Sequence, residues 1–322
     1  MNRKKFLSNL AFAGIGISSL GVSACNSSKK KVISSSAAKK PFFKLSLAQW
    51  SIHNMINNGK VSPYHFAELA KKWNFEGLEY VNDLYKDVMD ASNKSAALNQ
   101  FIKKNNQLAK QNDLKNLLIM IDGEGDLSSE KLSARLLSIE NHKPWVEAAS
   151  EMGCHSIRVN LHGSSDNIEA WKNSSKDSLS ILSDYDLNYN INILVENHGG
   201  FSSNADFLIS VINDVNKNNC GTLPDFGNFC ISKKWGTTSE ECDNEYDKYL
   251  GVKKLMSKAF AVSAKSHDFN SEGNEKNIDY ERMLKIVKEA NYSGYIGVEY
   301  EGTQLSEEDG TIATRDLLLK YA

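Results

Sequence analysis

Four segments in the second half of the chain combine a short apolar run with a terminal cluster of charged or polar residues. They read ILVENHGG (193–200), TLPDFGNF (222–229), AVSAKSHDF (261–269) and IGVEYEG (296–302). A buried β-strand that presents a carboxylate at its carboxyl end has this pattern, and parallel barrels place their active sites at that end of the strands. The sequence therefore predicts that Glu196, Asp225 and Glu299 meet at one rim.

These three carboxylates predict a cation among them. Buried carboxylates are costly without a cation or hydrogen-bond donors, and three neighbouring ones repel one another. Oxygen ligands suit Mg²⁺ or Mn²⁺, and an added imidazole widens the choice to Co²⁺ or Zn²⁺. We therefore expect Glu196, Asp225 and Glu299 to bind a divalent metal. The alternative is that each carboxylate caps a helix or pairs with a surface lysine.

Two further side chains lie close to these carboxylates in the sequence. His198 follows Glu196 by two residues and precedes Gly199 and Gly200, which let the backbone approach a ligand closely. We expect His198 to be catalytic, as a metal ligand, a hydrogen-bond donor or a proton shuttle, unless the backbone alone satisfies it. Lys265 has the inward parity of its predicted strand. It could polarise a carbonyl oxygen or serve only as a counter-ion.

Polar side chains also follow the other predicted strands and could bind a hydroxyl-rich substrate. Strand parity directs them toward the same rim, although each alone could be structural. The predicted substrate-binding residues are Gln49, Trp50, Glu79, Glu124, Asn160, His162 and His267. Among them, Trp50 would form an apolar wall for a sugar ring.

Eight strand-then-helix units position these residues. The predicted strands are 44–50, 77–81, 116–122, 155–160, 191–196, 220–225, 259–265 and 295–300. The predicted helices are 63–74, 93–112, 130–152, 167–189, 204–217, 243–257, 278–290 and 306–321. Strands that alternate with helices imply a parallel sheet, and eight units without a break in composition predict a single (β/α)8 TIM barrel. An open doubly wound sheet is the alternative, but no GxGxxG follows the first strand.

The N-terminus predicts export. Residues 1–24 have the basic start and short apolar core of a signal peptide, and Val22-Ser23-Ala24-Cys25 resembles a lipoprotein cleavage site. We expect a lipid anchor at Cys25, a flexible Ser/Lys/Ala-rich tether over 25–41 and the barrel over 42–322. The NRKKFL start resembles a twin-arginine signal with Arg-Lys in place of Arg-Arg. The alternative to export is a disordered tail with a chance cysteine.

Charge and cysteine usage narrow the class of partner. The formal net charge is −2, and removal of 1–24 and of the lysine-rich tether leaves a distinctly acidic barrel. Such a barrel is a poor nucleic-acid binder, because phosphate contacts dominate that affinity. The sequence has no CxxC, which excludes zinc-ribbon and thioredoxin-like motifs. A Cys230–Cys242 disulfide could form in an oxidising compartment.

Several motifs together resemble a known family. GLEYVN, LLIMIDGEG, IRVNLHG, ILVENHGG, PDFGNF and IGVEYEG resemble the xylose isomerase-like TIM-barrel superfamily, also called sugar phosphate isomerases/epimerases, over about residues 43–322. For its epimerase branch the resemblance implies a divalent metal held by Glu, Asp, His and Glu from strands five to eight. The two Glu residues act as acid and base on opposite faces of the substrate.

Carried onto this sequence, the resemblance assigns three metal ligands and leaves the fourth open. Glu196, Asp225 and Glu299 match, whereas Ser263 falls where the family usually has histidine. Three interpretations follow. His198 or His267 completes the site, or the metal binds weakly, or no metal binds and Lys265 takes the electrophilic role.

The function expected from all of this is proton abstraction next to a carbonyl. The predicted enzyme is an exported isomerase or epimerase of an unphosphorylated sugar, cyclitol or keto-sugar. One alternative is a lyase or hydrolase that acts on oxidised glycosides by the same enolate chemistry. Another is a non-catalytic sugar-binding lipoprotein, which Ser263 would permit. An AP-endonuclease role fits poorly with export, acidity and only seven histidines.

Overall fold

We analysed a computed structural model, which describes residues 40–163, 166–237 and 242–322. The expected signal peptide and all but the last two residues of the expected tether lie outside the described residues. Residues 40–322 form a compact unit by themselves. In the described part of the chain, no helix is long and apolar enough to cross a membrane.

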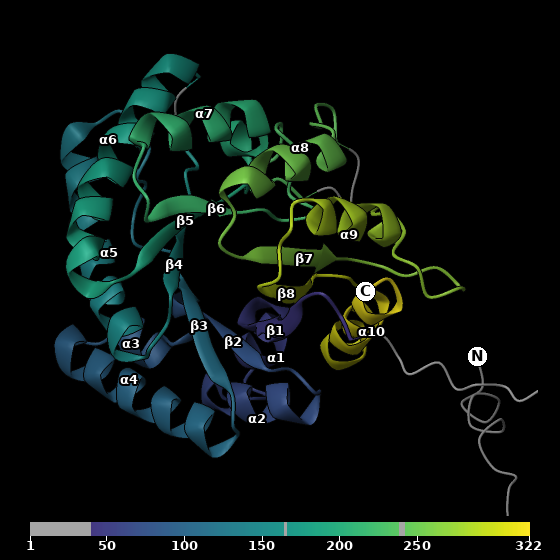
Figure 1. Ribbon diagram of the computed structural model, residues 1–322. Coiled ribbons are helices and arrows are strands. Elements are labelled where there is room, and N and C mark those ends of the chain that lie inside the picture. The colour runs from purple at the N-terminus through teal and green to yellow at the C-terminus, as the bar shows by residue number, and fades with distance from the viewer. Residues whose placement is uncertain (1–39, 164–165, 238–241) are drawn as a thin grey trace, which may run out of the picture. The chain divides into compact units, whose positions relative to one another are not determined.

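The described residues form a parallel sheet of eight strands with helices around it (Figure 1). The strands are β1 (Lys44–Ala48), β2 (Gly77–Val81), β3 (Lys115–Met120), β4 (Ser156–Val159), β5 (Asn192–Glu196), β6 (Cys220–Leu223), β7 (Val262–Ser266) and β8 (Tyr295–Tyr300). Their order is β6-β5-β4-β3-β2-β1-β8-β7. Parallel bridges Thr222–Ala259 and Asp225–Ser263 then join the two ends of this order. The sheet therefore curls into a TIM-barrel-like fold, as the sequence predicts.

Helices follow the strands as expected. They are α1 (His53–Asn57), α2 (Phe66–Lys72), α3 (Lys86–Met89), α4 (Lys94–Gln111), α5 (Leu132–Glu151), α6 (Ile168–Asp186), α7 (Ala205–Val215), α8 (Lys248–Leu255), α9 (Tyr280–Glu289) and α10 (Glu307–Lys320). Side-chain oxygens cap several amino ends, since Asn93, Asn167, Asn204 and Ser306 each accept a backbone N–H there. The sequence pattern therefore fixes most helix starts to within one or two residues.

Several boundaries differ from the prediction. The predicted helix 63–74 begins as a 3-10 turn, Pro63–His65, before α2. β6 ends at Leu223, because Pro224 has no N–H to continue the ladder. β7 begins at Val262, three residues late, and α8 begins at Lys248, after a long connection. The short helices α1 and α3 lie in connections where no helix is predicted.

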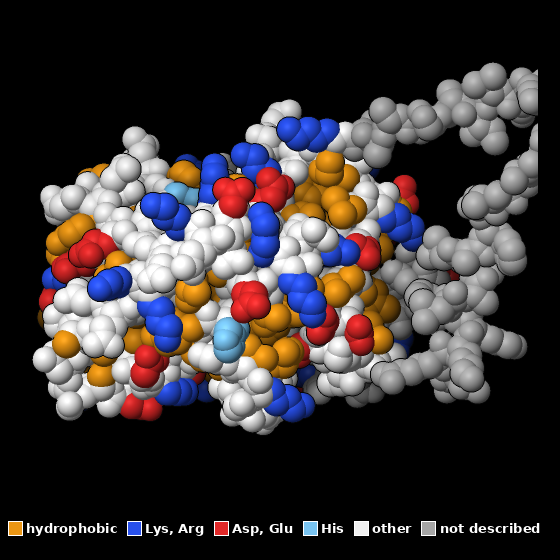
Figure 2. All heavy atoms as spheres, turned by 90° about the horizontal axis from the view of Figure 1, so that it is seen from below, with side chains coloured by type: hydrophobic (Ala, Val, Ile, Leu, Met, Phe, Trp, Pro, Cys, Tyr) orange, Lys and Arg blue, Asp and Glu red, His pale blue; other side chains and the backbone are white. Residues whose placement is uncertain are grey.

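The inside of the barrel carries polar as well as apolar residues at its carboxyl end. Arg158, Glu196 and Lys265 are all buried there. Gly297 makes room for one member of this layer, since a Cβ at that position would lie 2.4 Å from Oε2 of Glu79. On the outside, the face in Figure 2 intersperses acidic and basic side chains and has no basic stripe.

Another buried carboxylate, Asp186, lies away from this layer. Asp186 ends α6, just before β5, and neither of its oxygens has a hydrogen-bond partner among the described residues. Burial raises its pKa to about 8. A carboxyl group whose pKa is raised by folding stabilises the protein below its unfolded pKa and loses that contribution as pH rises through the folded pKa.

We therefore expect Asp186→Asn to raise the melting temperature at pH 9 by at least ~3 °C and to change it little at pH 4. Thermal unfolding of variant and wild type across this range measures the difference. A difference that did not depend on pH would contradict the assignment. Other buried carboxylates affect both proteins equally, so only the difference between the two curves counts.

Candidate functional site

The three carboxylates predicted at the rim lie together. Glu196 ends β5, Asp225 follows β6 and Glu299 lies in β8. One oxygen from each lies within 4.8 Å of the others, and all three side chains are buried. We call these residues the acidic triad.

Strand register aligns the triad with β7. Lys265 pairs with Glu299 across the β7–β8 ladder, and Ser263 bridges to Asp225 on the other side. Asn197 fixes the turn after β6, because its amide oxygen accepts the N–H of Asp225 and its amide nitrogen donates to the carbonyl of the same residue. The segment PDFGNF is thereby held beside the end of β5.

Each carboxylate of the triad has partners from the chain itself. Glu196 forms an ion pair with Arg158 (Oε2 to Nε, 3.0 Å) and accepts from the Asn228 amide at 3.1 Å. Asp225 accepts from the Ser263 hydroxyl at 2.6 Å and from a backbone N–H at 2.8 Å. Glu299 forms an ion pair with Lys265 (Oε1 to Nζ, 2.9 Å). Two buried cations and several neutral donors thus offset the three charges.

The electrostatics of these groups differ from one another. Burial, opposed mainly by Arg158, holds the pKa of Glu196 well above its usual range. Burial also raises the pKa of Asp225 to about 7, although Lys265 opposes it. Burial alone would lower the pKa of Lys265, but surrounding carboxylates, led by Glu299, outweigh it and hold that pKa well above the ordinary value. The site therefore combines a charged Lys265 with two carboxyl groups, Glu196 and Asp225, whose pKa values are raised.

His198 is held in one tautomer by a chain of polar contacts. Asp122 accepts from the amide nitrogen of Asn160 at 2.7 Å, so the amide oxygen of Asn160 faces Nδ1 of His198 at 3.0 Å. An amide oxygen only accepts, so Nδ1 carries the proton. Burial, followed by Lys265 and Arg158, holds the pKa of His198 well below its usual value. His198 is therefore neutral at pH 7, with Nε2 free to accept a substrate hydroxyl.

An aromatic group covers this histidine. Trp235, in the connection after β6, packs on His162 with ring centroids 4.6 Å apart and on His198 with centroids 5.4 Å apart. Two residues later, the Thr237 hydroxyl lies 3.0 Å from Nε2 of His267. The connection after β6 therefore reaches side chains in the segments that follow β4, β5 and β7.

Trp50 is connected to the triad through Glu301 and Lys265. Its indole N–H donates to Glu301, whose second oxygen lies 3.3 Å from Nζ of Lys265. The indole also stacks on His53, with ring centroids 4.3 Å apart. Trp50 is thus tied to the charged centre through one carboxylate, and its role as a sugar wall remains a prediction.

Three other residues predicted to bind substrate form hydrogen bonds within the protein. Gln49 donates to Pro63 and Tyr85 and accepts from a backbone N–H. Oε1 of Glu124 bonds Lys94 and the Trp145 indole. Glu79 accepts from Ser46 at 2.5 Å, and its other oxygen has no partner among the described residues. Of the three, Glu79 alone keeps an unused buried oxygen, and burial raises its pKa to about 7.

Four residues that contact the site are not among those predicted from the sequence. They are Arg158, Asn228, Glu301 and Trp235. Arg158 has the same strand parity as Asn160, so the alternation of side chains along that strand could have predicted that Arg158 points into the barrel. Trp235 lies in an irregular connection, where no periodicity applies.

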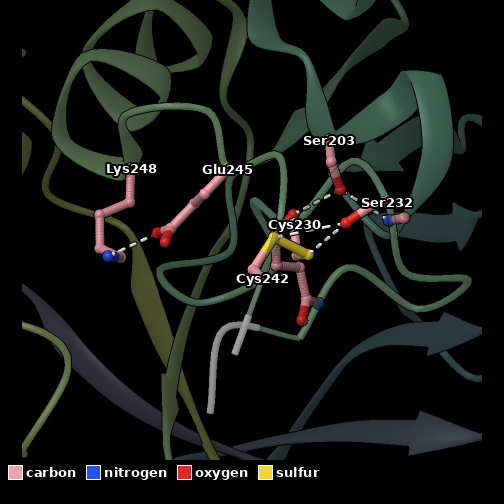
Figure 3. The surroundings of a disulfide bond; sticks show 8 residues. Ser203, Cys230, Ser232, Cys242, Glu245 and Lys248 are labelled. Carbon is pink, nitrogen blue, oxygen red and sulfur yellow. Dashed lines mark hydrogen bonds and ion pairs between the residues drawn. A yellow bond between two sulfur atoms is a disulfide. The ribbon is translucent and has the colours of Figure 1, made fainter. Parts of the chain in front are cut away.

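A disulfide closes the connection that carries Trp235. Cys230 and Cys242 are bonded, as the sequence analysis considered (Figure 3). Cys230 also donates its backbone N–H to Gly236 and pairs with Glu245, which forms an ion pair with Lys248 at 2.6 Å. The cross-link therefore braces the loop from which Trp235 and Thr237 reach the site.

We expect the double variant Cys230→Ser/Cys242→Ser to lose roughly 3 kcal/mol of unfolding free energy or less, because the unfolded chain regains the entropy of an open loop. Urea unfolding measures the loss, and limited proteolysis should cut near the loop faster than in wild type. A reductant should reproduce both effects in wild type and change nothing in the variant. An unchanged protease pattern would contradict the bracing role.

The acidic triad is consistent with a divalent metal by position and ligand type. A fourth protein ligand is missing from this group. Ser263 uses its hydroxyl to donate to Asp225, and neither His198 nor His267 belongs to the set of mutually close ligand atoms in the described residues. The identity of any ion therefore does not follow from the donor set.

Comparison with known proteins defines the class. A family model described as xylose isomerase-like TIM barrel matches residues 67–321. Since this match spans most of the sequence, the chain belongs to the xylose isomerase-like TIM-barrel family. A search of curated protein sequences finds no significant match.

Several solved structures share this fold. The IOLI protein with a bound zinc atom has a TM-score of 0.61 and 17% identity, covering 87% of this chain and 99% of its own. A xylose isomerase-like protein from Mycobacterium smegmatis, in complex with magnesium, has a TM-score of 0.60 and 14% identity, with coverages of 88% and 98%. The 3-keto-D-glucoside 4-epimerase YcjR from E. coli has a TM-score of 0.59 and 16% identity, with coverages of 88% and 100%. At such low sequence identities, these similarities show a shared fold and do not by themselves show a shared function.

Proposed function

We propose that this protein is a sugar isomerase or epimerase that abstracts a proton next to a carbonyl group. The observation that carries the proposal is the pair of buried glutamates, Glu196 and Glu299, whose ends lie within one small cluster and which pair with different cations. Carboxyl groups in contrasting environments are suited to separate acid and base roles. Family membership and a fold neighbour named as a keto-glucoside epimerase support the same class.

The chain's own residues suffice to describe the proton transfers. Glu299 takes the proton from the carbon beside the carbonyl, and the C–H electrons form the carbon–carbon double bond of an enediolate. A cation at the triad stabilises the oxygen that gains charge. Glu196, whose pKa burial raises, is suited to carry a proton and return it to carbon. Return to the same carbon from the other face gives an epimer, whereas return to the neighbouring carbon gives an isomer.

The proposed substrate is an unphosphorylated sugar, cyclitol or keto-sugar. The charges of Arg158 and Lys265, the buried cations beside the triad, are already balanced by carboxylates, so neither offers an unbalanced positive charge to a phosphate group. The neutral His198 and the unused oxygen of Glu79 suit hydroxyl groups instead.

Proton exchange tests the proposal. The full chain would be incubated in D₂O with free ketohexoses and methyl 3-keto-glucosides, each with and without added Mn²⁺, and the sugars analysed by NMR and mass spectrometry. Deuterium at a carbon beside the carbonyl, together with an epimer or isomer, is the expected result. Release of the methyl group as methanol would indicate a lyase or hydrolase. No exchange with any sugar would contradict the proposal.

We also propose that the protein is exported and anchored by lipid at Cys25. The Cys230–Cys242 disulfide supports an oxidising compartment. Expression of the full chain in bacteria fed labelled palmitate tests this proposal. Label in the wild type and none in Cys25→Ser is the expected result, and equal labelling of both would contradict it.

A further inference from the structure

The side chain of Lys265 lies beside the acidic triad. Its ammonium is 2.9 Å from Oε1 of Glu299 and 3.3 Å from Oε2 of Glu301, and the side chain is 1% exposed. Asp225 and Glu196 also contribute to its electrostatic environment. The ammonium is thus ion-paired with one of the three carboxylates that could hold a metal, and the charges of the other two also act on it.

The fold provides a defined space for this lysine. Gly227 packs against its aliphatic stem, and a Cβ there would lie 3.1 Å from Cγ and 3.3 Å from Cδ of Lys265. The same glycine donates its N–H to Asp225. The Tyr280 hydroxyl donates to the carbonyl of Lys265 at 2.7 Å and holds the strand end. The ammonium is therefore placed by rigid neighbours.

The other side chains around the triad provide no clear fourth ligand for a metal ion among the described residues. Ser263, at the position of a fourth ligand, donates its hydroxyl proton to Oδ2 of Asp225. Nε2 of His267 faces Thr237, Nδ1 of His198 faces Asn160, and neither histidine belongs to the mutually close ligand atoms of the described residues. A divalent ion in the triad would also lie next to the ammonium, and like charges at such distances repel strongly in a buried site.

We propose that the ammonium of Lys265 occupies the position of the divalent ion and serves as the electrophile, so that the site works without a resident metal. In the reaction proposed above, Nζ donates a hydrogen bond to the carbonyl oxygen and then to the enediolate oxygen. The lysine keeps its protons throughout, and the transferred proton moves only between carbon and the glutamates. This catalytic role depends on the proposed function, whereas the exclusion of metal does not.

Metal binding tests the exclusion directly. The full chain would be dialysed free of metal and titrated with Co²⁺, followed by visible absorption and by the shift in melting temperature. The wild type is expected to show no saturable site below about 1 mM. The variant Ser263→His/Lys265→Ala supplies an imidazole and removes the ammonium. It is expected to bind one Co²⁺ per chain at least ~100-fold more tightly, with four-coordinate absorption.

Adding Asp225→Asn to this variant serves as the matched control and should abolish the new site. Tight binding of one Co²⁺ by the wild type, lost in Asp225→Asn alone, would overturn the proposal. So would a folded double variant that gains no affinity. If the double variant does not fold, the wild-type titration alone still tests whether the site excludes a metal ion.

The catalytic role has a separate readout. If exchange of substrate protons is found, it is expected to persist in EDTA and to fall by about 10³-fold in Lys265→Met, with metal content unchanged. Exchange that stops in EDTA and returns with one metal would overturn the inference while leaving the proposed function intact. Absence of exchange in every condition would contradict the proposed function, and the Co²⁺ titration would still decide whether metal is excluded.

Discussion

Glu299→Gln is expected to lower the rate of substrate proton exchange by about 10³-fold, because an amide cannot take the proton from carbon. Glutamine keeps the size of the side chain and an oxygen that can face Lys265, so the fold should survive. Exchange in D₂O, followed by NMR under single-turnover conditions, measures the rate. Sugar affinity, measured by calorimetry, should change far less than the rate.

Glu196→Gln should show a different defect. If this residue returns the proton, exchange of the abstracted proton with solvent can continue while conversion to product fails. Asp186→Asn is the matched control, since it replaces a buried carboxylate at the other end of the barrel. Equal activity of Glu299→Gln and Asp186→Asn would rule out Glu299 as the base.

Arg158→Met is expected to cause the largest loss of stability of any single change in the site, about 3–5 kcal/mol. The guanidinium is 4% exposed, and it pairs with Asp122 at 2.9 Å and with Glu196 at 3.0 Å. Its removal leaves two carboxylates without their cation. Urea unfolding at pH 8 measures the loss.

Two variants serve as comparisons. Arg135→Met removes an arginine whose acidic partner, Asp177, is exposed, so a loss of about 1 kcal/mol is expected there. Adding Glu196→Gln to Arg158→Met should restore part of the stability, because the amide needs no counter-charge. Equal losses from the two arginine variants, with no restoration, would show that Arg158 does not neutralise buried charge.

Alternation along the strands was enough to predict most of the barrel and its acidic triad. A strand places every second side chain inside, and three strands each carry a carboxylate at the same level. The chemistry of the rim could therefore be predicted from Glu196, Asp225 and Glu299. Ser263 lies beside Asp225, on the inward side that its strand parity predicts.

The partners of the triad could not be predicted in the same way. Arginine is rarely buried unless paired, and the pairing of Arg158 joins residues more than thirty positions apart. Gln49 and Glu124 have the expected positions near strand ends, yet their polar atoms bond neighbours from other elements. The bonding partner of each of these side chains depends on contacts between distant segments, which local sequence patterns do not encode.

The cross-linked loop has a practical consequence for anyone producing this protein. A host that makes it in a reducing cytosol would deliver chains with separate Cys230 and Cys242 thiols, although Trp235 and Thr237 depend on that loop for their positions. Preparations of the same chain with reduced and with oxidised cysteines would then differ in the order of this loop while having the same mass to within two hydrogens. A screen for activity should begin with material folded under oxidising conditions.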